Sequence, residues 1–197
     1  MRRFDISTGA VILLSVLYFF GGFTLLCTLF IPVCVHELGH IAALKCFGAR
    51  GRGLRFDMTG LCISYAGLKN RSEEFICLAS GPVFGLAFAL LLSYLGNKTD
   101  NAFFLALSGF SLLLSAYNLL PALPLDGGRM LMCLLSAIFG EVKAGKSAEV
   151  ISLAVSASVA IYGAHMLSQP WGAALCVAGV MILLSQFESK VVYVTMM

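Results

Sequence analysis

Apolar runs of membrane-spanning length follow one another along this sequence. About 20 apolar residues in a helix cross a bilayer, and six runs approach or exceed that length: residues 7–20, 22–47, 74–95, 101–120, 148–167 and 171–188. Only Gly21-Gly22 interrupts the first two runs, and this pair predicts two helices in a tight hairpin rather than one long helix. We therefore expect an all-α polytopic membrane protein with six transmembrane helices.

The basic residues test this count, because Lys and Arg gather on the cytoplasmic side and each span exchanges the side on which the next loop lies. With six spans and a cytoplasmic N-terminus, Lys98 is the only Lys or Arg on the outer side. With a single span across residues 7–47, Arg2 and Arg3 would join Lys98 there, which is a poorer division. The sequence thus predicts N- and C-termini in the cytoplasm.

Residues 54–65, between the second and third spans, carry a different pattern. Apolar residues alternate with other residues around Thr59-Gly60, namely Leu54, Phe56 and Met58 and then Leu61, Ile63 and Tyr65. Period-two spacing about a short turn that contains glycine is typical of a β-hairpin. We expect a small hairpin there in an otherwise helical protein.

The composition supports a membrane location and limits the function. Hydrophobic residues make up 59% of the chain and charged residues 12%, whereas soluble domains carry about 25% charged residues. No loop is long enough to fold alone, so residues 1–197 are expected to form one membrane domain with its core at about 22–139. The net charge is only +3 and the basic residues are spread over short loops, which excludes a nucleic-acid partner.

His36-Glu37-Leu38-Gly39-His40 interrupts the second apolar run, and ionisable side chains at membrane depth generally indicate function. Residues four apart share one face of a helix, so His36 and His40 are placed to bind one Zn²⁺, with Glu37 displaced by about 100° beside the metal. This spacing is the H-E-x-x-H signature of zinc proteases. The alternative is two packed or pore-lining histidines that meet the pattern by chance. Two of only three histidines fall in the motif, which favours the zinc site.

A catalytic zinc usually takes three protein ligands, so a third must come from elsewhere in the chain. The best candidate is Asp126, which follows Pro121 and Pro124 and precedes Gly127-Gly128. The glycines permit close backbone approach or a positive φ beside Asp126. Two alternatives stay open: Asp126 caps a short helix from about Arg129 to Phe139, and Asn118 caps the helix before it.

Together these segments resemble the site-2 protease family of intramembrane metalloproteases. The resemblance rests on residues 36–40 and 118–128, with support from Glu73-Glu74-Phe75 and Ser80-Gly81-Pro82. The motif Asn-Leu-Leu-Pro-x-x-Pro-Leu-Asp-Gly-Gly most resembles that of the stage IV sporulation protein FB branch. The resemblance covers about residues 22–139, and we expect neither a PDZ insertion nor a nucleotide-sensing domain after the last span.

The resemblance implies an enzyme and its site. It implies that His36, His40 and Asp126 bind one Zn²⁺ per chain, that Glu37 activates water, and that Asn118 holds the substrate or its oxyanion. The reaction would be hydrolysis of a peptide bond in or near a transmembrane segment of a membrane-tethered regulatory protein, such as a pro-sigma factor. The implied setting is the bacterial cytoplasmic membrane, with the lipid bilayer, a membrane-protein substrate and inhibitory membrane proteins as partners.

Two questions stay open at this level. A transporter or channel could use the buried His, Glu and Asp as an ion or metal pathway, but the candidate ligands cluster in one helix and one loop rather than in several spans. The 54–65 hairpin either offers an edge strand to an extended substrate or only packs over the site.

Overall fold

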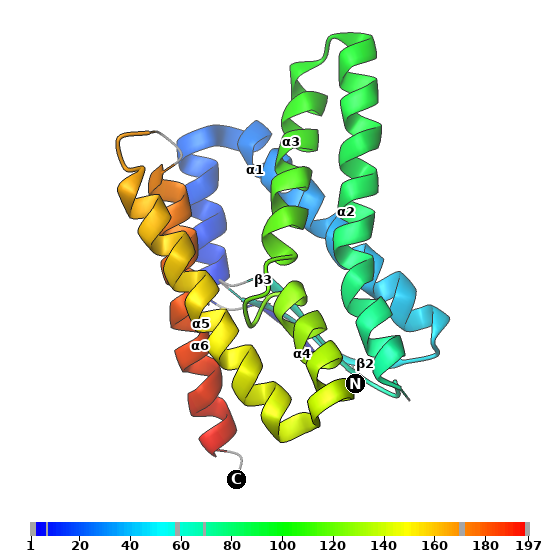
Figure 1. The fold of residues 1–197 in the computed structure, drawn as a ribbon. Helices are drawn as coiled ribbons and strands as arrows, with labels where there is room; N and C mark the ends of the chain where they lie inside the picture. Colours follow the sequence, from blue (N-terminus) through cyan, green and yellow to red (C-terminus); the bar gives the residue numbers. More distant parts are fainter. Residues whose placement is uncertain (1–2, 7, 58–59, 69, 170–171, 196–197) are drawn as a thin grey trace. The chain divides into compact units, whose positions relative to one another are not determined.

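The computed structural model describes residues 3–6, 8–57, 60–68, 70–169 and 172–195, which form six helices and three short strands (Figure 1). The chain divides into two compact units, Met1–Tyr117 and Asn118–Met197. The first unit carries the three strands and helices α1 to α3, and the second carries α4 to α6. The expectation of one membrane domain stays a prediction.

The first unit is built on two long apolar helices and one shorter one. They are α1 (Thr8–Cys46), α2 (Arg71–Thr99) and α3 (Ala102–Asn118). Within α1, Gly22 has φ 65° and ψ −168°, so two helices meet there at a sharp change of direction (Figure 1). A positive φ is readily adopted only by glycine, which confirms the break predicted from Gly21-Gly22.

The first unit also contains a three-stranded sheet with strand order β1-β2-β3. Strands β2 (Arg50–Asp57) and β3 (Gly60–Ala66) pair antiparallel, with Leu54 opposite Ile63. Gly60, expected in the turn, is the first residue of β3, and Met58 and Thr59 lie outside the described residues. The sequence pattern missed β1 (Arg3–Ile6), which pairs parallel to β2. It has only 4 residues, too few for a period-two pattern to be recognised.

The second unit contains α4 (Asp126–Phe139), α5 (Glu141–His165) and α6 (Gly172–Thr195). Some helix ends differ from the predicted spans: α2 continues through residues 96–98, α5 begins at Glu141 rather than at residue 148, and α6 runs past residue 188. The reason is that hydropathy marks only the apolar part of a helix. Lys and Glu are good helix formers, so α5 and α6 extend through polar residues that end a membrane span.

Within the described residues, three helices are long and apolar enough to cross a membrane, namely Gly21–Cys46, Arg71–Thr99 and Glu141–His165. Two shorter apolar helices cover Ala102–Asn118 and Gly172–Gln186. Large apolar side chains face outward, with Phe19 84% and Leu90 75% exposed, as expected of side chains that contact lipid. The count of six spans stays a prediction.

Small residues let α2 and α3 pack closely. Ser111 Oγ donates to the carbonyl oxygen of Gly85 at 2.8 Å, and Ser108 Oγ donates to that of Ala89 at 2.7 Å. A Cβ at Gly85 would collide with Ser115 Oγ. Close approach at Gly, Ala and Ser together with hydroxyl hydrogen bonds is how helices associate without a hydrophobic driving force in lipid. This packing holds α2, the helix that contacts His40.

Candidate metal centre

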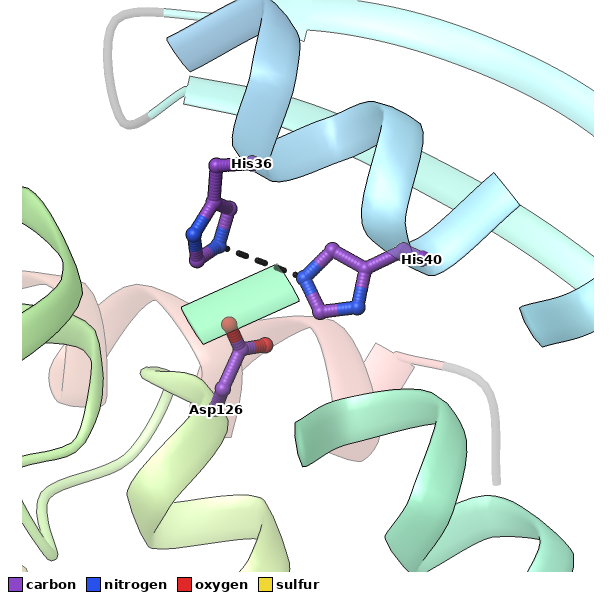
Figure 2. A group of neighbouring side chains, drawn as sticks. All are labelled: His36, His40 and Asp126. Carbon is purple, nitrogen blue, oxygen red and sulfur yellow. Dashed lines mark hydrogen bonds between the residues drawn. The ribbon is translucent and has the colours of Figure 1, made fainter. Parts of the chain in front are cut away.

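His36 and His40 lie on one face of α1, as their spacing predicts. Their Nε2 atoms are 3.2 Å apart, and the rings are steeply inclined, at 78° (Figure 2). Two nitrogens bound to one tetrahedral zinc, each at about 2.0–2.1 Å, are about 3.3 Å from each other. The histidine pair therefore has the spacing that a single zinc ion requires.

A backbone carbonyl on α2 determines which ring nitrogen of His40 carries the proton. His40 Nδ1 donates to the carbonyl oxygen of Cys77 at 2.7 Å, and Ser80 Oγ donates to the same oxygen at 2.6 Å. When Nδ1 of a neutral imidazole carries the proton, Nε2 has the lone pair that binds a metal. Metal-ligating histidines commonly donate their other ring nitrogen in this way, which also fixes the plane of the ring.

Two glycines bring α1 and α2 together beside this histidine. A Cβ at Gly81 would collide with Nε2 of His40, and a Cβ at Gly39 would lie 2.6 Å from the carbonyl oxygen of Ser80. Both positions therefore require glycine if the helices are to keep this separation. The third residue of the Ser80-Gly81-Pro82 motif, Pro82, is fully buried within α2. The motif thus packs against Nε2 of His40, the nitrogen proposed to bind the metal.

Gly81→Ala is expected to weaken zinc binding by roughly 10-fold or more, the range seen when groups that orient a metal ligand are altered. The added methyl group displaces the His40 ring, whose Nε2 lies against this position. Competition with a chelator measures the affinity. Gly109→Ala on α3 is the control, because nothing lies within 4 Å of a Cβ added there, and it is expected to bind zinc normally. Unchanged zinc affinity in Gly81→Ala would show that Gly81 does not position the His40 ring.

Asp126 is the first residue of α4, whose N-cap is Leu125. The interpretation of Asp126 as an N-cap is therefore wrong, and the helix expected from about Arg129 begins at Asp126 itself. The physical reason is that Leu125 already has the extended backbone of a cap, with φ −61° and ψ 159°. The positive end of the helix dipole at Asp126 favours the ionised carboxylate, which is the form that binds a metal.

Gly127 and Gly128 pack the start of α4 against the backbone before it. A Cβ at Gly127 would collide with the carbonyl oxygen of Leu119, and one at Gly128 would lie 2.5 Å from the amide nitrogen of Leu123. Close backbone approach at these two glycines, one of the roles that the sequence allowed, is therefore confirmed. The carboxylate of Asp126 is carried by a helix end with little freedom to shift.

Glu37 and Asn118, the two residues with predicted catalytic roles, belong to different helices. Glu37 is half-buried on α1 beside His36, and Asn118 is the last residue of α3. Both catalytic roles stay predictions. His165, the third histidine, is exposed at the end of α5.

Three residues thus offer donor atoms of the kind that zinc binds: the imidazoles of His36 and His40 and the carboxylate of Asp126 (Figure 2). Two nitrogens and one oxygen match the ligand types of catalytic zinc sites, which keep the fourth position for water or substrate. By the chemistry of their donor atoms, these residues fit zinc. The histidine pair belongs to the first compact unit and Asp126 to the second.

Comparison with known proteins points to one family. The model of peptidase family M50 matches residues 97–162. A zinc metalloprotease of Methanocaldococcus jannaschii is 30% identical over 140 residues, which are 68% of this chain and 41% of that protein. A Synechocystis protein named as a zinc metalloprotease is 29% identical over 123 residues, 59% of this chain and 32% of that protein. The chain thus spans less than half the length of these relatives.

The fold is also that of a known structure. The site-2 protease from Methanocaldococcus jannaschii superimposes with a TM-score of 0.71 at 22% identity, over 91% of this chain and 86% of that one. The matched family model, the relatives and the fold together support peptidase family M50, the site-2 proteases. The relatives imply zinc as the metal. The sporulation branch finds no support among them.

Proposed function

We propose that this protein is an intramembrane zinc metalloprotease that hydrolyses a peptide bond in or near a transmembrane segment of another membrane protein. The observation that carries the proposal is the pair of Nε2 atoms of His36 and His40, 3.2 Å apart on an apolar helix of membrane-spanning length. Ionisable side chains are costly at membrane depth, so their presence there indicates a function. Binding of a metal ion is a function of this kind.

His36, His40 and Asp126 hold one zinc ion in this proposal. Zinc at such a site activates water and polarises the carbonyl group of the substrate. The Glu37 carboxylate accepts a proton from the attacking water and delivers it to the leaving amine. The side-chain amide of Asn118, at the end of α3, donates a hydrogen bond to the oxyanion that develops on the substrate.

The direction of cleavage follows from the proposed topology, with both termini in the cytoplasm of a bacterial cell. His36 lies nine residues before Lys45 on α1, which at 1.5 Å per residue is about 14 Å from the cytoplasmic boundary. Water reaches the site from that side, so cleavage occurs near the cytoplasmic ends of substrate spans. A pro-sigma factor or a similar membrane-tethered regulator is a substrate of this kind, and an inhibitory membrane protein would act on the same face.

The test of this function is a reconstituted assay with the purified protein in lipid bilayers. Its zinc content is measured, and a membrane-anchored reporter is incubated with it before and after chelation. About one zinc per chain and cleavage that chelation abolishes are the expected results. Ion or metal transport without cleavage would instead favour a transporter.

The sheet offers a place for the substrate. Strand β3 lies at one edge of the order β1-β2-β3, and an exposed edge pairs readily with an extended peptide. Proline at alternate positions of β3 removes backbone donors, so we expect slower cleavage of the reporter with unchanged zinc content. Equal cleavage rates in all of these variants would leave β3 with a packing role only.

A further inference from the structure

Ser152 of α5 is fully buried, and its hydroxyl contacts a backbone segment far away in the sequence. The amide of Leu123 donates to Ser152 Oγ at 2.6 Å, and the same hydroxyl lies 3.4 Å from the carbonyl oxygen of Leu123. Leu123 precedes Asp126 by three residues. A side chain in the middle of α5 therefore holds the segment that leads into the proposed metal ligand.

The segment between α3 and α4 needs such a partner. Irregular backbone at membrane depth is tolerated only where its polar groups are satisfied within the protein or by water. The amide of Ala122 donates to the carbonyl oxygen of Leu120 at 2.7 Å, and that of Leu125 donates to Ala122 at 2.9 Å. The amide of Leu123 instead leaves the segment and reaches Ser152. This contact ties the segment to α5.

The contact reaches Asp126 through the packing of α4. The Cα of Gly128 lies so close to Leu123 that an added Cβ would be 2.5 Å from the amide nitrogen. The peptide held by Ser152 is thus also the peptide against which the first turn of α4 packs. We propose that Ser152 is a positioning residue that holds Asp126 in place for metal binding. This inference rests on the proposed function, in which Asp126 is a zinc ligand.

Ser156 provides a matched control one turn further along α5. It is also fully buried, but its hydroxyl donates to the carbonyl oxygen of Ser152 at 2.6 Å and lies 3.2 Å from Nε2 of Gln186 on α6. These contacts stay within α5 and α6. Ser156→Ala therefore removes a buried hydroxyl of the same kind without touching the segment before Asp126.

The experiment compares zinc affinity in the full-length protein in bilayers, by chelator competition, together with the absorption spectrum of the Co²⁺-loaded form. Ser152→Ala is expected to weaken zinc binding by roughly 10-fold or more and to alter the Co²⁺ spectrum. Ser156→Ala is expected to leave both unchanged. Ser152→Thr keeps the hydroxyl and is expected to recover most of the affinity.

Two results would overturn the inference: unchanged zinc affinity in Ser152→Ala, or an equal loss in Ser152→Ala and Ser156→Ala. Asp126→Asn separates these results from a failure of the proposed function. If Asp126→Asn binds zinc normally, the proposed ligand set is wrong. If Asp126→Asn loses zinc while Ser152→Ala keeps it, only the positioning role fails.

Hydrogen exchange of the unaltered protein gives a second measurement, which no folding defect of a variant obscures. The amide of Leu123 is expected to exchange slowly and to exchange more slowly still when zinc is bound. Rapid exchange in both states would overturn the inference, because an amide anchored on a buried hydroxyl is protected until the segment opens.

Discussion

Glu37→Gln is expected to lower the rate of reporter cleavage by about 10²- to 10⁴-fold, the usual contribution of a general acid or base, while zinc stays bound. Glutamine preserves the size and polarity of the side chain but cannot accept the proton of the attacking water. Glu37 is displaced by about 100° around α1 from His36, so its loss leaves the histidine pair intact. The measurement is the initial rate of cleavage at matched zinc content.

Glu149→Gln is the control for this substitution, because Glu149 is an exposed residue of α5 and the same chemical change there is expected to leave the rate unchanged. A Glu37→Gln protein that cleaves at the normal rate would refute the assignment of the general base. A protein that loses its zinc would make Glu37 a ligand instead. The inactive, zinc-loaded protein would also retain its substrates, so sequencing peptides trapped with it in the native membrane would identify them.

The parts of the site that the sequence predicted are local in the chain. His36 and His40 share a face because helix periodicity alone places residues four apart together, and the structure shows this with Nε2 atoms 3.2 Å apart. The break at Gly22 and the close packing at Gly127 and Gly128 follow from the absence of a Cβ. Each of these predictions needed only neighbouring residues.

The supporting contacts could not be predicted, because they join distant residues through backbone atoms. His40 donates to the carbonyl oxygen of Cys77, 37 residues away, and the amide of Leu123 donates to Ser152, 29 residues away. Every residue carries a carbonyl oxygen, so the sequence does not mark the acceptor at Cys77. A serine in an apolar run is equally uninformative until the packing of the helices is known.

The start of α4 has the same origin. Asp is among the preferred N-cap residues, whereas Leu is not, so local propensity favoured the alternative in which Asp126 caps the helix. In the structure Leu125 takes the cap conformation and makes no side-chain capping bond. Asp126 lies instead within the first turn of α4. Residues at functional sites often depart from local helix propensity, because their identity is selected for the chemistry of the site.

Asp126→Asn is expected to lower zinc affinity by more than about 100-fold, beyond the loss caused by altering groups that only orient a ligand. The substitution removes the anionic ligand and leaves a neutral amide in its place. If Asp126 only stabilised α4, the cost would be the interaction of its charge with the helix dipole, about 0.3–1 kcal/mol of stability. The two roles therefore differ in what they change: zinc affinity in one case, a small part of the unfolding free energy in the other.

Asp100→Asn is the matched control, because Asp100 caps the far end of α2 with φ 50°, a conformation that Asn adopts readily. It is expected to bind zinc normally. Zinc affinity and thermal stability are measured on both variants in the same bilayers. A small loss of stability with normal zinc binding in Asp126→Asn would reduce Asp126 to a residue that stabilises α4. It would then leave the histidine pair of α1 in need of a different third ligand.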